Sequence, residues 1–160
     1  MSAKAMTPRV LIFGTGSIGG VYAYLLSRGI PESHIVVICR SNYDRVFADG
    51  ITIQSTLWGN DLRVRPTVVR SVTEAAALSS DPFDYILVCS KALPTVPSTA
   101  EIIKPAVSPA TTIVLIQNGE LFIVHCVGPQ SGCKPGNPSP KLPIVTYVQE
   151  YMQIYTVLHS

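Results

Sequence analysis

The hexapeptide Gly14–Gly19 (GTGSIG) restricts the possible folds of this chain more than any other feature. The short apolar run Arg9–Phe13 comes directly before it, and the segment Ser17–Arg28 continues from it. That segment has its apolar residues three and four positions apart, as on one face of a helix: Ile18, Val21, Tyr22, Leu25 and Leu26. A strand, a GxGxxG turn and a helix in succession are typical of a unit that binds the pyrophosphate of a dinucleotide.

Each glycine of the motif has its own physical requirement. Gly14 allows a tight turn out of the strand, Gly16 lets the backbone approach a pyrophosphate, and Gly19 lets the helix pack close to the sheet. The first turn of the helix then offers free N–H groups and the positive end of its dipole to the phosphates. A glycine-rich turn without a ligand would also fit the hexapeptide alone, and the flanking strand and helix favour the binding site.

Apolar β-branched runs and helical patterns alternate along the chain, which predicts a doubly wound α/β fold with a mainly parallel sheet. We expect strands over Arg9–Phe13, His34–Cys39, Ile51–Leu57, Leu62–Val69, Asp84–Cys89 and Thr111–Ile116. We expect helices over Ser17–Arg28, from Ser41 or Asn42 to about Ala48, from Ser71 onward, and over Pro94–Ile103.

Several local features set the expected boundaries of these elements. Gly29 occupies the position of a C′ glycine, and Gly50 ends the short second helix. The segment Trp58–Asp61 predicts the turn of a β-hairpin between the third and fourth strands. Ser71, with Glu74 three residues later, predicts a capping box.

Composition excludes several classes of partner. The chain has 160 residues, of which 47% are hydrophobic and 14% charged, so it can fold as one domain. A net charge of +2 without a run of basic residues argues against nucleic acid or an anionic membrane as the main partner. No apolar run is long enough to span a bilayer and no signal peptide is recognisable, so we expect a cytoplasmic protein.

The four cysteines predict neither a disulfide framework nor a metal centre. Cys39 and Cys89 lie within apolar runs, where a free cysteine behaves as a small core residue. His125, Cys126 and Cys133 lack a fourth ligand and the spacing of common zinc sites, so we expect no metal.

The residue at the end of the second strand indicates which cofactor binds. Enzymes that use NAD usually place a carboxylate there to accept a hydrogen bond from the ribose 2′-hydroxyl, whereas this chain has Arg40. A guanidinium can bind a 2′-phosphate through two charge-assisted hydrogen bonds. A solvated arginine at a strand end is the alternative, and the absence of a carboxylate favours NADP.

Two polar residues follow later strands at the edge where open α/β sheets bind ligands. Lys91 comes shortly after Asp84–Cys89, and Asn118 shortly after Thr111–Ile116. Their spacing alone leaves open whether they are functional or are a surface lysine and a turn asparagine.

Four stretches together carry a resemblance to a known family: GTGSIGG, VICRSNYD, VCSKAL and IQNG. The chain resembles ketopantoate reductase (2-dehydropantoate 2-reductase), especially its fungal members, over about residues 8–120. The resemblance implies NADPH-dependent reduction of a 2-oxo acid, ketopantoate, on the route to pantothenate. It also implies that Arg40 binds the 2′-phosphate, that Lys91 lies beside the cofactor, and that Asn118 contacts the nicotinamide end and the substrate. The expected cofactor-binding residues are Gly14, Thr15, Gly16, Ser17, Ile18, Gly19, Arg40, Lys91 and Asn118.

The resemblance ends soon after Asn118, which divides the chain into an expected NADP-binding domain over residues 1–120 and a divergent tail over 121–160. Gly128–Pro143 is rich in proline and glycine, and residues 144–160 suggest a weak strand or helix. The resemblance places the catalytic lysine in a helical domain that this sequence lacks, so we assign no catalytic residue, not even to Lys134 or Lys141. We therefore expect a truncated product with an incomplete sheet that is prone to self-association.

Three functions remain open at this point. The chain is the cofactor-binding part of a ketopantoate-reductase-like enzyme, a non-catalytic NADP-binding or interaction module, or a different Rossmann dehydrogenase. Arg40 and the IQNG stretch weigh against the third.

Overall fold

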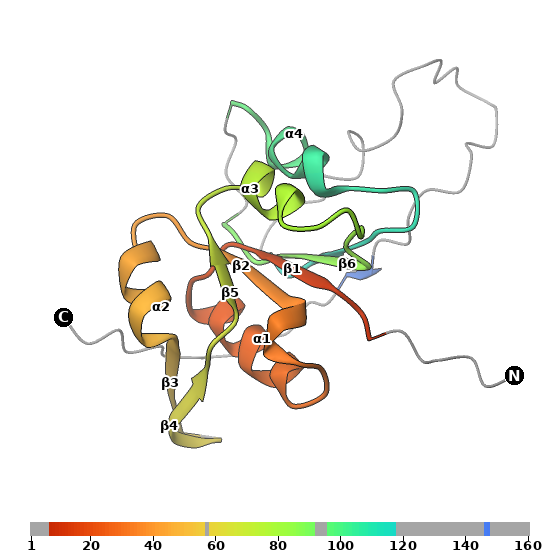
Figure 1. Ribbon diagram of the computed structural model, residues 1–160. Coiled ribbons are helices and arrows are strands. Elements are labelled where there is room, and N and C mark those ends of the chain that lie inside the picture. The colour runs from red at the N-terminus through yellow and green to blue at the C-terminus, as the bar shows by residue number, and fades with distance from the viewer. Residues whose placement is uncertain (1–6, 57, 92–95, 118–145, 148–160) are drawn as a thin grey trace, which may run out of the picture.

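A computed structural model describes residues 7–56, 58–91, 96–117 and 146–147 of the chain (Figure 1). Its strands are β1 (Val10–Phe13), β2 (Ile35–Ile38), β3 (Ile51–Ser55), β4 (Gly59–Val64), β5 (Thr67–Val69), β6 (Tyr85–Val88), β7 (Thr112–Leu115) and β8 (Thr146–Tyr147). Its helices are α1 (Ser17–Ser27), α2 (Tyr43–Asp49), α3 (Val72–Ala77) and α4 (Thr99–Ile103), with short 3₁₀ turns at Glu32–His34 and Lys104–Ala106.

The main sheet is parallel, with the strand order β5-β2-β1-β6-β7-β8. The central strand β1 pairs on one side with β2 and on the other with β6, so that Leu11 lies between Val36 and Ile86. The chain winds outward from β1 first in one direction and then in the other. This is the doubly wound arrangement that the alternation of strands and helices predicts.

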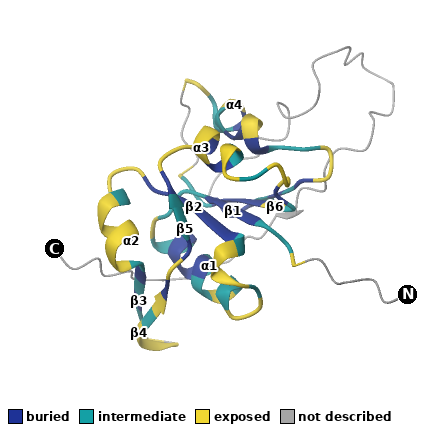
Figure 2. Ribbon diagram, in the orientation of Figure 1, coloured by how far each residue is buried: buried dark blue, intermediate teal, exposed yellow. Residues whose placement is uncertain are grey.

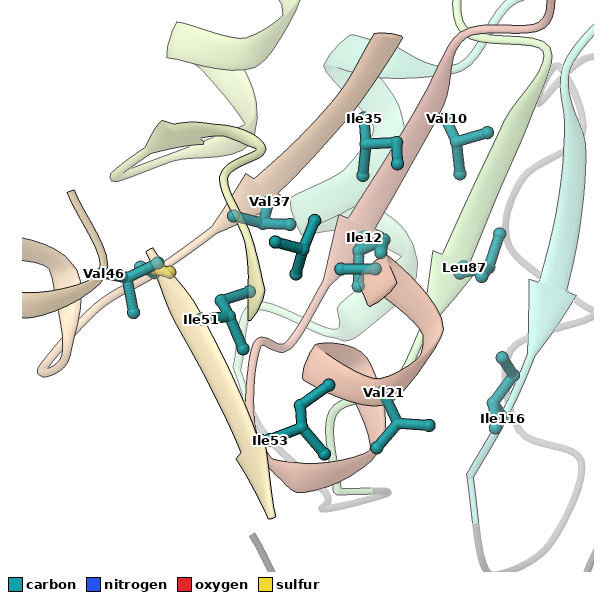
Figure 3. Close-up of a cluster of buried hydrophobic side chains, with 13 residues drawn as sticks. Val10, Ile12, Val21, Ile35, Val37, Val46, Ile51, Ile53, Leu87 and Ile116 are labelled. Atoms are coloured by element: carbon teal, nitrogen blue, oxygen red, sulfur yellow. The ribbon is translucent and has the colours of Figure 1, made fainter. Parts of the chain in front are cut away.

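Helices cover both faces of the sheet, which explains why its strands are apolar without alternation (Figures 1 and 2). Val10 and Ile12 of β1 pack on one face with residues of α1, α2 and the β3–β4 hairpin. Leu11 packs on the opposite face with residues of α3 and α4. Figure 3 shows the first of these clusters, in which Val21 of α1 lies near Ile53 of β3.

The hairpin differs from its expected form at two points. The predicted strand Leu62–Val69 is divided after Val64, and its second half, β5, leaves β4 to pair in parallel with β2. Pro66 lies at the division, where it lacks the N–H that a continuing strand would need. The turn also lies earlier than expected, because Gly59 already pairs with Ser55 in the β3–β4 ladder.

The helix boundaries are confirmed in part. Ser71 accepts a hydrogen bond from the Glu74 N–H at 3.1 Å, as the capping box predicts, although the Glu74 carboxylate accepts from the N–H of Arg70 rather than that of Ser71. Gly50 ends α2 with φ +78°. Gly29 directly follows the C-cap residue Arg28 and so occupies the predicted C′ position of α1, although its backbone is not left-handed.

The helix predicted over Pro94–Ile103 begins only at Thr99. The Ser98 hydroxyl accepts a hydrogen bond from the Glu101 N–H at 3.3 Å, and the Glu101 carboxylate accepts one from the Ser98 N–H at 2.7 Å, which completes a capping box. The Ser-x-x-Glu spacing was present in the sequence and marks this start better than Pro94 does.

The outer edge of the sheet lies beyond β7. Val114 and Leu115 pair in parallel with Thr146 and Tyr147 of β8, so β7 has a short neighbour within residues 144–160, where a weak strand or helix was expected. The predicted Pro/Gly-rich segment Gly128–Pro143 lies outside the described residues, and the boundary at residue 120 stays a prediction. No helix among the described residues has the length and apolar character needed to cross a membrane.

Candidate dinucleotide site

The loops that follow β1, β2 and β6 meet at the carboxyl edge of the sheet and enclose a cleft of about 760 Å³. Residues 14–18 of the glycine loop, Arg40 and Lys91 all line this cleft, together with Asn42 and Ser90. Three segments that are far apart in the sequence therefore come together as predicted. Asn118, which was also expected here, lies outside the described residues.

Two of the three glycines are required by close contacts within the protein. Gly14 has φ +99°, and a Cβ atom there would lie 2.5 Å from the backbone nitrogen of Ser90. A Cβ atom at Gly19 would lie 2.3 Å from the carbonyl oxygen of Gly14. Both distances are too short for real carbon contacts, so these glycines let β1, α1 and the loop after β6 approach one another.

Gly16 differs from Gly14 and Gly19 because no contact with the described residues requires it. A Cβ atom at Gly16 would have no heavy atom of these residues within 4 Å, and Gly16 is exposed. Gly16 is also the N-cap residue of α1, and the first turn of that helix contains no acidic side chain. The first N–H groups of a helix have no partner within it, so they are available to an anion beside Gly16.

Two hydrogen bonds fix the glycine loop against the segment that follows β2. The Thr15 hydroxyl donates to the carbonyl oxygen of Ile38 at 2.8 Å, and the Asn42 side-chain amide donates to the carbonyl oxygen of Thr15 at 3.0 Å. From the sequence, Asn42 was expected only as a possible helix cap. It is the N-cap residue of α2, but its side chain makes no capping hydrogen bond and holds the loop instead.

Arg40 extends from the end of β2 into the cleft as an exposed side chain. Among the described residues, no carboxylate or hydrogen-bond acceptor binds its guanidinium. The nearby carboxylate of Asp44 is engaged elsewhere, because it pairs with Arg70 at 2.7 Å. Arg70 also lies 3.7 Å from the ring centroid of Tyr43. The charge of Arg40 is therefore available to a bound anion.

The loops after β6 and β7 are joined by a buried amide. The side chain of Gln117 donates to the carbonyl oxygen of Ser90 at 2.6 Å and lies 3.2 Å from the Ser90 hydroxyl. No role was predicted for Gln117 from the sequence. Its amide fixes the end of the described segment after β7 against Ser90.

The two described cysteines are unsuited to nucleophilic chemistry. Burial raises the pKa of Cys89 to about 12. Burial also raises the pKa of Cys39, although a hydrogen bond with Thr15 lowers that pKa by a smaller amount. A thiol reacts as its thiolate, so both stay unreactive near neutral pH. Among the described residues, no group of three potential ligands could hold a metal ion.

We expect Cys39 and Cys89 to resist iodoacetamide at pH 8 in the folded protein, because each pKa is raised and the thiolate fraction is small. Peptide mapping by mass spectrometry measures their alkylation, with the urea-unfolded chain as the fully reactive control. Equal labelling rates in the folded and unfolded chain would contradict the expectation.

The parallel strand order, the glycine loop at the start of α1 and the cleft at the carboxyl edge define a Rossmann-type domain. The family model "Ketopantoate reductase PanE/ApbA" matches residues 10–125. The chain belongs to this family, as the resemblance of the four sequence stretches implied.

Individual relatives agree with this assignment. The chain is 34% identical over 108 residues to the meiotically up-regulated gene 72 protein of Schizosaccharomyces pombe, covering 68% of this chain and 18% of that protein. The 2-dehydropantoate 2-reductase of Methylococcus capsulatus is 39% identical, with a TM-score of 0.58 and coverage of 69% of this chain and 34% of that one. The 2-dehydropantoate 2-reductase of Geobacter metallireducens GS-15 is 27% identical, with a TM-score of 0.58. The match covers 70% of this chain and 34% of that one. The chain thus spans about a third of the solved structures, and less of the yeast protein.

Proposed function

We propose that this chain binds NADP(H) in the cleft at the carboxyl edge of the sheet. The observation that carries the proposal is the contrast among the three glycines. Gly14 and Gly19 are required by contacts within the protein, whereas a side chain at Gly16 would meet only open space. The pyrophosphate of a dinucleotide needs this space, and the first turn of α1 supplies N–H donors to it.

The phosphorylated form of the cofactor is favoured by the charge at the end of β2. The guanidinium of Arg40 has no carboxylate partner among the described residues, and it lines the same cleft as Gly16. A 2′-phosphate would give it a dianionic partner with a geometry suited to two hydrogen bonds.

The cleft also has an apolar wall, formed in part by Val96 and Pro97 before α4 and by Ile102 within it. Such a surface suits a flat heterocycle, because ligand sites are mostly apolar with a few polar groups that fix orientation. We place the adenine ring on this side of the cleft, within reach of the 2′-phosphate position at Arg40.

The reaction that fits this family is reduction of a 2-oxo acid such as ketopantoate. When bound, NADPH supplies a hydride for the carbonyl carbon of the substrate. In this chain, the glycine loop and Arg40 would hold the cofactor, Lys91 would lie beside it, and Asn118 would contact the substrate. The chain spans about a third of the length of the solved reductases, so their activity comes to this chain only as part of the proposal.

A second candidate is a module that binds NADP without turnover. It is favoured by the chemistry of the described cleft, where Lys91 is exposed and Cys89 is kept protonated by its raised pKa. Hydride transfer to a carbonyl needs a proton donor with a suitable pKa near the developing alkoxide and a site closed to water. Lys91 is the one lysine among the described residues that line the cleft, and it is exposed to solvent rather than enclosed.

We therefore expect the 160-residue chain to bind NADPH but not to reduce ketopantoate at the rate of an ordinary enzyme, roughly 1–1000 per second. NADPH fluorescence measures binding, and its absorbance in the presence of ketopantoate measures turnover. Steady turnover in that range would refute the second candidate and require a search for the donor among Lys91, Lys134 and Lys141. Failure to bind NADPH would refute both candidates.

A further inference from the structure

A second cleft, of about 390 Å³, adjoins the glycine loop between α2 and the β3–β4 hairpin. It shares Thr15, Gly16 and Asn42 with the larger cleft, but neither Arg40 nor Lys91 lines it. Its volume is at the lower end of the range for small-molecule sites. The family resemblance assigns no residue of this second cleft outside the glycine loop.

Two arginines make the second cleft basic. Arg63 lies in β4 and Arg65 follows its last residue, Val64; Val64 is buried, whereas both arginines are exposed. Both arginines line the cleft. Neither guanidinium has an ion pair or hydrogen bond with any other described residue.

Two carboxylates also line this cleft and must be weighed against the arginines. Asp61 accepts a hydrogen bond from the side-chain amide of Gln54 at 2.8 Å, and that amide's oxygen accepts from the Asp61 N–H at 3.1 Å. Asp49 lies at the end of α2. With Arg45, the cleft holds three arginines against two aspartates, so its formal charge is positive.

We propose that this second cleft binds a small phosphate monoester, with the phosphate on Arg63 and Arg65. Two guanidinium groups that line the same cleft can both donate charge-assisted hydrogen bonds to one dianion, which offers it more donors than a single arginine does. Thr15, Gly16 and Asn42 line both clefts, so this ligand would lie beside the glycine loop that is proposed to bind the dinucleotide. The site is nevertheless separate from the cofactor's 2′-phosphate, whose partner Arg40 lines only the larger cleft.

The experiment is a titration of the ¹⁵N-labelled chain with glycerol 3-phosphate, read from the backbone amide shifts, with glycerol as the control ligand. It is done with and without saturating NADPH, which distinguishes a free monoester from the phosphates of the cofactor. We expect saturable shifts around Thr52 and Arg63–Arg65 under both conditions. Replacing either arginine, Arg63→Ala or Arg65→Ala, should weaken binding about tenfold, equivalent to about 1.4 kcal/mol.

The matched control is Arg28→Ala, which removes the same charge from an exposed position at the end of α1. It should leave the affinity for glycerol 3-phosphate unchanged. Shifts confined to Gly14–Gly19 and abolished by NADPH would overturn the proposal, because the monoester would then occupy the dinucleotide loop. Equal losses in all three variants would also overturn it, since they would indicate only general attraction to a basic protein. If NADPH fails to bind, the proposed cofactor function fails, but the shifts near Arg63 still decide this second site.

Discussion

Replacing Gly16 with valine should weaken NADPH binding by at least about a hundredfold, roughly 2.7 kcal/mol, while the protein stays folded. The reason is that a Cβ atom at this position has no heavy atom of the described residues within 4 Å, so the valine side chain would fill the space proposed for the pyrophosphate. NADPH fluorescence titration measures the affinity, and far-ultraviolet circular dichroism measures whether the variant has folded. Unchanged affinity in a folded variant would show that the loop is only a turn.

Two further glycines serve as controls for this substitution. A Cβ atom at Gly29 would have only the Leu26 carbonyl oxygen nearby, at 3.8 Å, so Gly29→Val should both fold and bind NADPH normally. Gly19→Val should instead destabilise the fold, because its Cβ would lie 2.3 Å from the Gly14 oxygen. We expect a loss of about 3 kcal/mol or more in the free energy of unfolding, measured by urea denaturation.

Replacing Arg40 with alanine should remove most of the preference for NADPH over NADH. A charge-assisted hydrogen bond contributes about 1.5–3 kcal/mol, so the wild-type chain should prefer NADPH by roughly ten- to a hundredfold. The variant should lose affinity for NADPH and keep its affinity for NADH, because only the 2′-phosphate is affected. Separate titrations with both cofactors measure the ratio.

Arg28→Ala is the control for this second prediction as well, since it removes an exposed arginine far along α1 from the loop. It should leave the ratio of the two affinities unchanged. Equal affinities for NADPH and NADH in the wild-type chain would contradict the role of Arg40. An unchanged preference in Arg40→Ala would place the 2′-phosphate elsewhere, with Arg70 at the end of the neighbouring strand as the first residue to test.

Much of the fold could be predicted because its determinants are local. The central strands β1 and β2 are buried on both faces, so their sequences are apolar throughout and predict strands directly. The GxGxxG spacing predicts the first turn and helix, and the structure shows close contacts that require Gly14 and Gly19 and open space beside Gly16. The gathering of Arg40 and Lys91 at one cleft follows from the parallel order of the strands.

The features that could not be predicted depend on contacts between distant segments. The strand predicted over Leu62–Val69 divides because its second half, β5, pairs with β2 instead of β3. Pro66 is the one residue in the sequence that indicates this division. Asn42 occupies a cap position, but the carbonyl oxygen of Thr15 offers its side chain a partner 27 residues away in sequence. Gln117 likewise acquires its role from Ser90, on a different strand end.

The most direct test of NADP binding at this cleft is a titration of the ¹⁵N-labelled chain with NADPH, followed through the backbone amides. We predict saturable shifts that are largest at Gly14–Ile18, Arg40–Asn42 and Ser90–Lys91, the segments that line the larger cleft. NADH should shift the glycine loop at higher concentration and leave Arg40 nearly unaffected. The absence of saturable shifts, or shifts confined to residues outside this cleft, would contradict the proposal that this chain binds NADP(H) there.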